Sequence, residues 1–101
     1  MKTVIVRYKT KPGSTAENEQ YIKAVFKELQ ESSPGGLRYV SFKLADGLSF
    51  VHIASIDTAD GSNPLTQSPA FKAFLAGIKD RCEEQPVAIE ATEIGSYRCF
   101  G

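Results

Sequence analysis

The segment from Leu37 to Ile56 constrains the fold of this chain most strongly. Apolar and polar residues alternate along it, with one interruption at Asp46-Gly47. Alternation is typical of β-strands, and an Asp-Gly pair favours a two-residue hairpin turn because both central positions take positive φ. The turn also fixes the register, which places Ser41 opposite His52, the only histidine. The other expected pairs are Lys43 with Phe50, Phe42 with Val51, Val40 with Ile53 and Tyr39 with Ala54.

Patterns before the hairpin predict a strand and then a helix. Residues 2–9 alternate in the manner of a strand. Ser14 and Glu17 have the spacing of a capping box, which satisfies free backbone donors at a helix start. Proline and two glycines end this helix at about Ser32. Its apolar face is expected to contain Ile22, Val25, Phe26 and Leu29.

A second helix and a final strand are predicted after the hairpin. Ser68 is a suitable N-cap, with Pro69 at the first helical position. Apolar residues then recur at helical spacing as far as Cys82. Pro86 ends this pattern, and residues 87–100 are predicted to form a long extended segment with a bulge or bend at Gly95. The expected apolar face of the second helix contains Phe71, Phe74, Leu75, Ile78 and Cys82.

The predicted order of elements is therefore β-α-β-β-α-β, which is the ferredoxin-like α+β arrangement. The chain of 101 residues has the length of one domain. Right-handed crossovers place both helices on one face of a single antiparallel sheet, whose expected strand order is 4-1-3-2. The prediction is a single domain over residues 1–101.

The pattern also predicts which side chains the helices cover. We expect the covered face to contain the aliphatic set Val4, Val6, Val40, Phe42, Val51 and Ile53. The helix-free face is then expected to contain Ile5, Arg7, Tyr39, Ser41, Lys43, Phe50, His52, Ala54 and Ile56. So large an apolar area is rarely left in water, so we expect a second copy to cover it and form a homodimer.

A candidate site follows from this assignment, in the cavity between the sheet and the partner. His52 titrates near neutral pH and is the candidate catalytic residue, as a general base toward a phenol or carbon acid. Arg7 is a candidate anion-binding residue, and Tyr39 can stack on an aromatic substrate or donate a hydrogen bond. Ser41 and Phe50 complete the expected ligand-binding set. A small aromatic ligand would suit this lining.

Structural roles for the same residues remain open. His52 can instead bond to Ser41 across the strand pair and fill interface space. Arg7 can form an ion pair with Glu90 or Glu93 on the last strand. One histidine without further ligands at suitable spacing does not indicate a metal site, and no cofactor motif is present.

Composition excludes several classes of function. Acidic and basic residues balance at twelve each, without the basic patch that nucleic acids require. The N-terminal apolar run is too short for a signal peptide or a membrane span, so we expect a cytoplasmic protein with no membrane partner. Cys82 and Cys99 have no metal-binding spacing and are expected to be free thiols.

The element order, the stretch "SPAFKAF" and the ending "IGSYRCF" resemble the dimeric α/β-barrel superfamily. Within it, the chain is most similar to antibiotic-biosynthesis-monooxygenase-type domains. The resemblance implies a homodimer whose two sheets enclose a cavity. It also implies either oxidation of aromatic substrates without metal or flavin, or binding and degradation of haem.

The functional residues of that family are not all present. Its members use an asparagine on the first strand and a tryptophan, whereas this chain has Arg7 and Tyr8 on that strand and no tryptophan. The only asparagines are Asn18 and Asn63. The haem-ligating histidine of the family lies near the second helix, not where His52 lies. Three hypotheses therefore stand: a cofactor-independent monooxygenase-like enzyme, a non-catalytic ligand-binding or interaction module, and a haem-binding protein.

Overall fold

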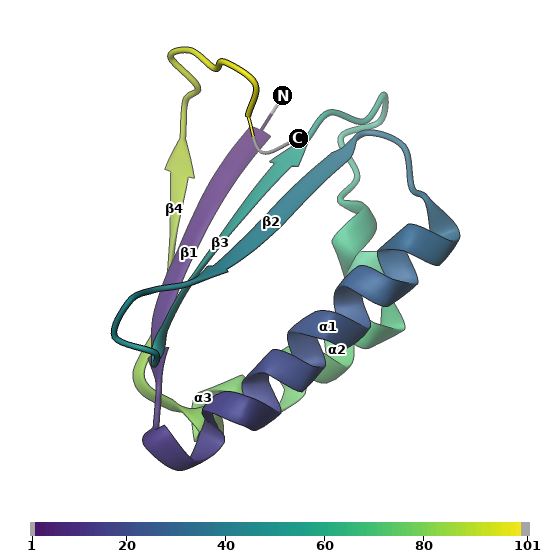
Figure 1. The fold of residues 1–101 in the computed structure, drawn as a ribbon. Helices are drawn as coiled ribbons and strands as arrows, with labels where there is room; N and C mark the ends of the chain where they lie inside the picture. The colour runs from purple at the N-terminus through teal and green to yellow at the C-terminus, as the bar shows by residue number, and fades with distance from the viewer. Residues whose placement is uncertain (1, 100–101) are drawn as a thin grey trace.

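The computed structural model describes residues 2–99, which form a four-stranded sheet with helices on one side (Figure 1). The strands are β1 (Lys2–Thr10), β2 (Leu37–Lys43), β3 (Ser49–Ile56) and β4 (Cys82–Ala91). The helices are α1 (Thr15–Ser32), α2 (Pro69–Ala76) and the short α3 (Ile78–Arg81), with 3-10 turns at Pro12–Ser14 and Pro64–Gln67. The predicted order of elements is confirmed.

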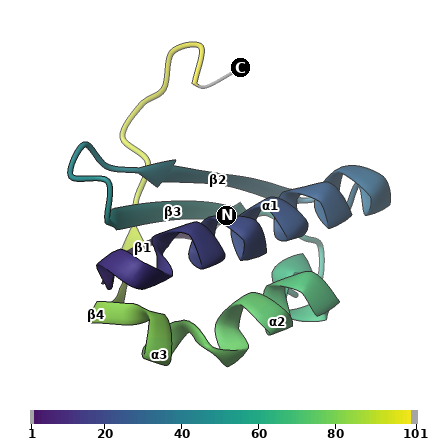
Figure 2. The ribbon, with the colours of Figure 1, turned by 60° about the horizontal axis from the view of Figure 1, so that its bottom comes forward.

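The sheet and the helices form two layers. The strands pair antiparallel in the order β2-β3-β1-β4, which confirms the predicted topology. Figure 2 shows α1 and α2 on the same side of the sheet, whereas the chain after β4 extends on the opposite side. The buried core between the layers consists of Tyr8, Val25, Phe50, Leu65, Phe74, Ile78 and Cys82.

The central hairpin has the predicted register but a longer loop. All five expected pairs between β2 and β3 are present. The backbone N–H of Leu44 donates to the carbonyl of Ser49 at 2.8 Å, so the loop contains residues 45–48 and is not a two-residue turn. Only Gly47 in this loop has positive φ, at 74°. Asp46 instead accepts hydrogen bonds from two following backbone N–H groups, which stabilises the wider loop.

The two long helices begin where the sequence predicts. Ser14 is the N-cap of α1, but its side chain makes no capping hydrogen bond, so the predicted capping box does not form. The helix ends at Ser32, where Ser33 adopts a left-handed conformation. Ser68 caps α2 as expected, because its side chain accepts a hydrogen bond from the N–H of Phe71 at 3.0 Å.

The end of the second helix and the last strand differ from the prediction. Gly77 separates α2 from α3, and Cys82 is the first residue of β4 instead of the last apolar residue of a helix. Pro86 lies within β4, near the register shift in its pairing with β1. An edge strand tolerates proline there because one side of its backbone needs no partner. The strand ends at Ala91, so residues 92–99 are not the predicted extended strand, and Phe100 lies outside the described residues.

In the hairpin strands β2 and β3 the two faces of the sheet are exchanged relative to the prediction, whereas in β1 they are as predicted, with Val4 and Val6 covered and Ile5 and Arg7 on the helix-free face. His52 pairs with Ser41 on β2 and with Val6 on β1, so these side chains share one face. That face lies under the helices, where His52 and Phe50 are only 4% and 2% exposed. The grouping within the hairpin is therefore confirmed, but the assignment of His52 and Phe50 to the helix-free face is wrong. The helix-free face instead contains Ile5, Arg7, Val40, Phe42, Val51, Ile53, Val87 and Ile89.

No helix within residues 2–99 is long and apolar enough to cross a membrane. Cys82 is buried and Cys99 is exposed, and both are free thiols.

Candidate functional site

The imidazole of His52 lies at the centre of a buried group of aromatic rings. It stacks on Tyr8 of β1 with 5.3 Å between ring centroids and on Tyr39 of β2 at 5.8 Å. The ring of Phe74 from α2 lies 5.4 Å away on the helix side. The expected position of His52 between two sheets is therefore wrong, because a helix covers it within its own chain.

Both nitrogens of the imidazole are hydrogen-bonded. Nε2 lies 2.7 Å from the hydroxyl of Tyr8, and Nδ1 lies 2.7 Å from the hydroxyls of both Tyr39 and Ser41. The sequence thus predicts the grouping of His52, Tyr39 and Ser41, including the cross-strand bond to Ser41. Tyr8 was not predicted as part of the site.

Asn18 and Arg81 extend this network from the helical layer. The Nε of Arg81 donates to Oδ1 of Asn18 at 3.1 Å, and Nδ2 of Asn18 donates to the hydroxyl of Tyr8 at 2.8 Å. Both residues are almost fully buried. Neither residue is predicted from the sequence as part of the site, although each is a polar residue at a position of the apolar helical stripe. Asn18 lies four residues before Ile22, and Arg81 three residues after Ile78.

The network has one direction of hydrogen-bond donation. Arginine only donates, so the Asn18 oxygen faces Arg81 and the Asn18 amide nitrogen donates to Tyr8. The remaining partner of the Tyr8 hydroxyl is Nε2 of His52, so its proton is donated there. A neutral imidazole carries one proton, which is then on Nδ1 and faces Tyr39 and Ser41. Each group therefore donates a hydrogen bond to the next, from Arg81 through Asn18, Tyr8 and His52 to the hydroxyls on β2.

Burial keeps these groups in their neutral forms. It lowers the pKa of His52 to about 4, because the apolar surroundings disfavour the imidazolium. Burial likewise raises the pKa of Tyr39 to about 12 and raises the pKa of Tyr8 further. At pH 7 the network is therefore uncharged apart from Arg81.

Arg81 carries a buried positive charge without a carboxylate partner. Its guanidinium lies 4.5 Å from the ring centroid of Tyr21, and Nη2 donates to the carbonyl of Phe74 at 2.6 Å. Within residues 2–99 it forms no ion pair. No carboxylate neutralises this charge, so its electrostatic field favours negative charge in the neighbouring neutral network.

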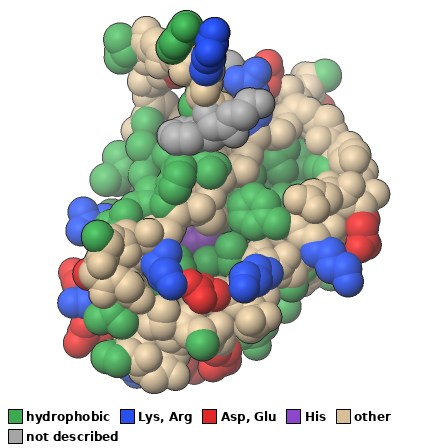
Figure 3. Space-filling view, in the orientation of Figure 1, with side chains coloured by type: hydrophobic (Ala, Val, Ile, Leu, Met, Phe, Trp, Pro, Cys, Tyr) green, Lys and Arg blue, Asp and Glu red, His purple; other side chains and the backbone are tan. Residues whose placement is uncertain are grey.

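The network reaches the surface between β2 and α1. Figure 3 shows the imidazole at the floor of a hollow in this face of the molecule. Tyr39 stacks on Phe26 of α1, with 5.1 Å between ring centroids. It also lines an adjacent groove of about 200 Å³ between the end of α1 and the start of β2. A ligand in this region would meet Tyr39 before it met His52.

Two of the predicted ligand-binding residues, Arg7 and Phe50, do not line the groove beside Tyr39. Arg7 is exposed on the helix-free face, so it does not join His52. Within residues 2–99 it pairs with neither Glu90 nor Glu93, and Glu90 is in register with Val4 on the other face. Phe50 stacks on Tyr8 at 5.5 Å and is part of the core.

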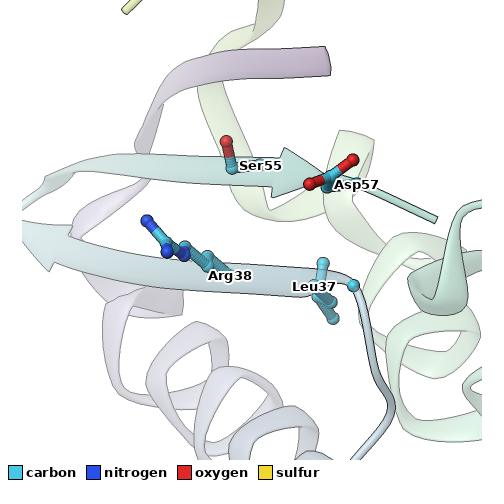
Figure 4. A pocket seen from close by; sticks show the side chains of 5 residues that line it. Leu37, Arg38, Ser55 and Asp57 are labelled. Carbon is cyan, nitrogen blue, oxygen red and sulfur yellow. The ribbon is translucent and has the colours of Figure 1, made fainter. Parts of the chain in front are cut away.

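Another hollow, of about 230 Å³, lies at the far end of the hairpin. Gly36, Leu37, Arg38, Ser55 and Asp57 line it. Figure 4 shows the Arg38 side chain directed along the sheet and away from Asp57. Within residues 2–99, no group of three or more His, Cys, Asp or Glu side chains is arranged to hold a metal ion.

No protein-family model and no curated protein sequence matches the chain. Solved structures do match. Rv0793 from Mycobacterium tuberculosis has a TM-score of 0.76 at 16% identity, over 94% of this chain and 96% of the other. An antibiotic biosynthesis monooxygenase has a TM-score of 0.76 at 14% identity, over 94% and 100%. SnoaB from Streptomyces nogalater, a cofactor-independent oxygenase, has a TM-score of 0.70 at 17% identity, over 96% of each chain. The predicted fold, that of antibiotic-biosynthesis-monooxygenase-like domains, is confirmed.

Proposed function

We propose that this chain is a small monooxygenase-like enzyme that acts, without a bound cofactor, on an aromatic or enolisable substrate at the hollow between β2 and α1. The observation that carries the proposal is the directed network that runs from Arg81 to Tyr39. A cofactor-independent oxygenase, SnoaB, has the same fold, which supports the reaction class.

The proposed chemistry is stabilisation of a substrate anion. Oxygen reacts with the electron-rich phenolate or enolate form of such substrates. Nδ1–H of His52 faces the hydroxyls of Tyr39 and Ser41, which also hydrogen-bond to each other. In the proposed reaction the Tyr39 hydroxyl accepts from Nδ1 and turns its own proton from Ser41 to the substrate oxygen. Donors that are fixed before the reaction stabilise developing negative charge strongly in a site shielded from water. In this role His52 supplies a hydrogen bond through Tyr39, and the geometry supports that role better than the general base expected from sequence.

Oxygen uptake with a hydroquinone and with a β-diketone tests this proposal. Tyr39→Phe keeps the ring that stacks on Phe26 but removes the donor, so we expect kcat to fall by about 10²- to 10³-fold. Tyr97→Phe is the control, because Tyr97 is 83% exposed and lies outside the network. Full activity in Tyr39→Phe, or no oxygen uptake by the wild-type protein with either compound, would contradict the proposal.

A non-catalytic binding module is the second candidate. The observation in its favour is that the imidazole is 4% exposed and already has hydrogen bonds at both nitrogens. Binding of either compound without oxygen uptake would support this candidate. Haem ligation by His52 is less favoured, because iron would have to displace Tyr8 or both hydroxyls at Nδ1.

We also propose that two copies pair through the helix-free face of the sheet. This face is apolar although its members differ from the predicted set. Val87 and Ile89 of β4 are 58% and 61% exposed, and Ile94 on the following segment is 96% exposed. Val87 and Ile89 lie around one hollow of this face together with Ile5 and Val51, and exposed apolar surface of this kind typically marks an interface between chains. A second copy of the chain would bury this apolar surface, so no other partner is needed to cover it.

A further inference from the structure

A hollow of about 430 Å³ lies in the helix-free face, over β1, β3 and β4. Its volume falls within the range of roughly 300–1,000 Å³ that is typical of small-molecule sites. Branched aliphatic side chains form much of its lining, namely Ile5, Val51, Val87 and Ile89. The aliphatic lining and Arg7 lie on the face of the sheet opposite His52, and Tyr8 is the only residue of the His52 network that also lines the hollow.

Two cations line this hollow, Arg7 and Lys9, and Arg7 is the one that lies among the aliphatic side chains. The register places it between Val51 of β3 and Val87 of β4, on the helix-free face. Within residues 2–99 it forms no ion pair, whereas the nearby Lys9 pairs with Glu83 at 3.4 Å. Glu84 lines the same hollow but is in register with Lys9, beyond the register shift that follows Arg7. Arg7 is thus an unpaired charge among aliphatic side chains.

Covering this face would leave Arg7 in need of an anion. In one free chain water solvates the guanidinium, but burial of an unpaired charge costs several kcal/mol, so buried charges are normally paired. We infer that the hollow binds a ligand with a carboxylate and an apolar body, the carboxylate against Arg7 and the body on the aliphatic lining. The hollow and Arg7 are present in a single chain. The argument that Arg7 requires an anionic partner rests on the proposed dimer, because only the dimer buries its charge.

The chemistry of arginine favours a carboxylate as the anionic group. The guanidinium offers a planar pair of N–H donors that matches the two oxygens of a carboxylate. The aliphatic lining adds affinity in proportion to the apolar area that the ligand buries. A ligand with only one of these two features is therefore expected to bind much more weakly.

Calorimetric titration with octanoate tests the inference, with octanol and acetate as partial ligands. We expect octanoate to bind wild-type protein at least tenfold more tightly than either partial ligand. Arg7→Gln is expected to weaken octanoate binding about tenfold or more, and Arg7→Lys to weaken it less, since it keeps the charge. Arg38→Gln is the matched control, because Arg38 lies on the sheet in a separate hollow (Figure 4). Circular dichroism confirms that each variant is folded.

Three results would overturn the inference. The first is no octanoate binding by wild-type protein, and the second is equal binding by Arg7→Gln. The third is octanoate binding that appears only in Glu84→Gln, which would show that Arg7 is already paired with Glu84 of a second copy. Sedimentation velocity without ligand tests the proposed dimer separately. Arg7-dependent binding by a monomer would retain the ligand site and reject the dimer.

Discussion

At the scale of single residues, the direction of hydrogen bonding in the buried network is set by Arg81. This guanidinium has no acceptor, so it fixes the orientation of the Asn18 amide, and Asn18 in turn fixes the Tyr8 hydroxyl. Arg81 and Asn18 thus place the proton of His52 on Nδ1 through Tyr8, although neither of them is hydrogen-bonded to the imidazole. The tautomer is therefore a property that a distant substitution can reverse.

The substitution Asn18→Asp is expected to reverse the tautomer of His52. A carboxylate accepts from both neighbours, so the Tyr8 proton turns toward position 18 and His52 then donates from Nε2. Nitrogen NMR of the imidazole measures this, since His52 is the only histidine. We expect Nδ1–H in the wild-type protein and Nε2–H in the variant. The same tautomer in both proteins would show that Arg81 does not direct the network.

Burial of His52 also makes stability depend on pH. The ordinary pKa is 6.5 and the folded value is about 4, so between these values the unfolded chain binds a proton that the folded protein does not. The stability is full above about pH 6.5 and is lost as the pH falls toward 4, by roughly 3 kcal/mol in total. Urea unfolding at pH 7, 5.5 and 4.5 measures the loss. His52→Gln lacks this titration, so its free energy of unfolding should fall less over the same range.

At the scale of elements, Glu28 of α1 joins the two long helices. Its carboxylate accepts hydrogen bonds from the Ser68 hydroxyl and from the backbone N–H of Ala70, at the start of α2. A negative charge there also interacts favourably with the helix dipole. Glu28→Ala is expected to lower the free energy of unfolding by about 1–2 kcal/mol. Glu31→Ala, an exposed position on the same helix, should change it by less than about 0.5 kcal/mol in the same denaturation experiment.

Elements whose signals are local were predicted well. The hairpin register follows from alternation around Asp46-Gly47, and the start of α2 follows from Ser68 and Pro69. The break at Gly77 was not predicted, because apolar spacing continues across it to Cys82. Glycine at that point is favoured by packing, since a Cβ there would lie 3.0 Å from Nη1 of Arg81. This contact depends on the folded position of the Arg81 side chain, so it cannot be predicted from the sequence pattern.

At the scale of the whole molecule, the choice of the covered face was not predictable from local patterns. Alternation shows that Ser41 and His52 share a face, but no turn links β1 to β3, so the parity of Val6 relative to His52 has no local signal. The structure buries the face with Tyr8, Phe50 and the imidazole, since aromatic rings bury a large area and their polar groups have partners there. Asn18 of α1 donates to the Tyr8 hydroxyl, and hydroxyls of the sheet itself bond both nitrogens of the imidazole. The predicted site therefore separated into a buried group around His52 and an exposed Arg7.

The structure shows which apolar residues are exposed on the helix-free face, so the proposed dimer can be tested by a substitution at one of them. If two copies pair through the helix-free face, Ile89→Lys buries a second positive charge in the hollow that already contains Arg7, so this variant should abolish the dimer. Leu75→Lys is the matched control, because Leu75 is 48% exposed on α2, in the opposite layer. Sedimentation velocity at micromolar concentration should show a dimer for the wild-type and Leu75→Lys proteins and a monomer for Ile89→Lys. A wild-type monomer would reject the proposed interface. A dimer lost only in Leu75→Lys would move the interface to the helical layer, where a second copy would cover the entrance to the His52 network instead of the Arg7 hollow.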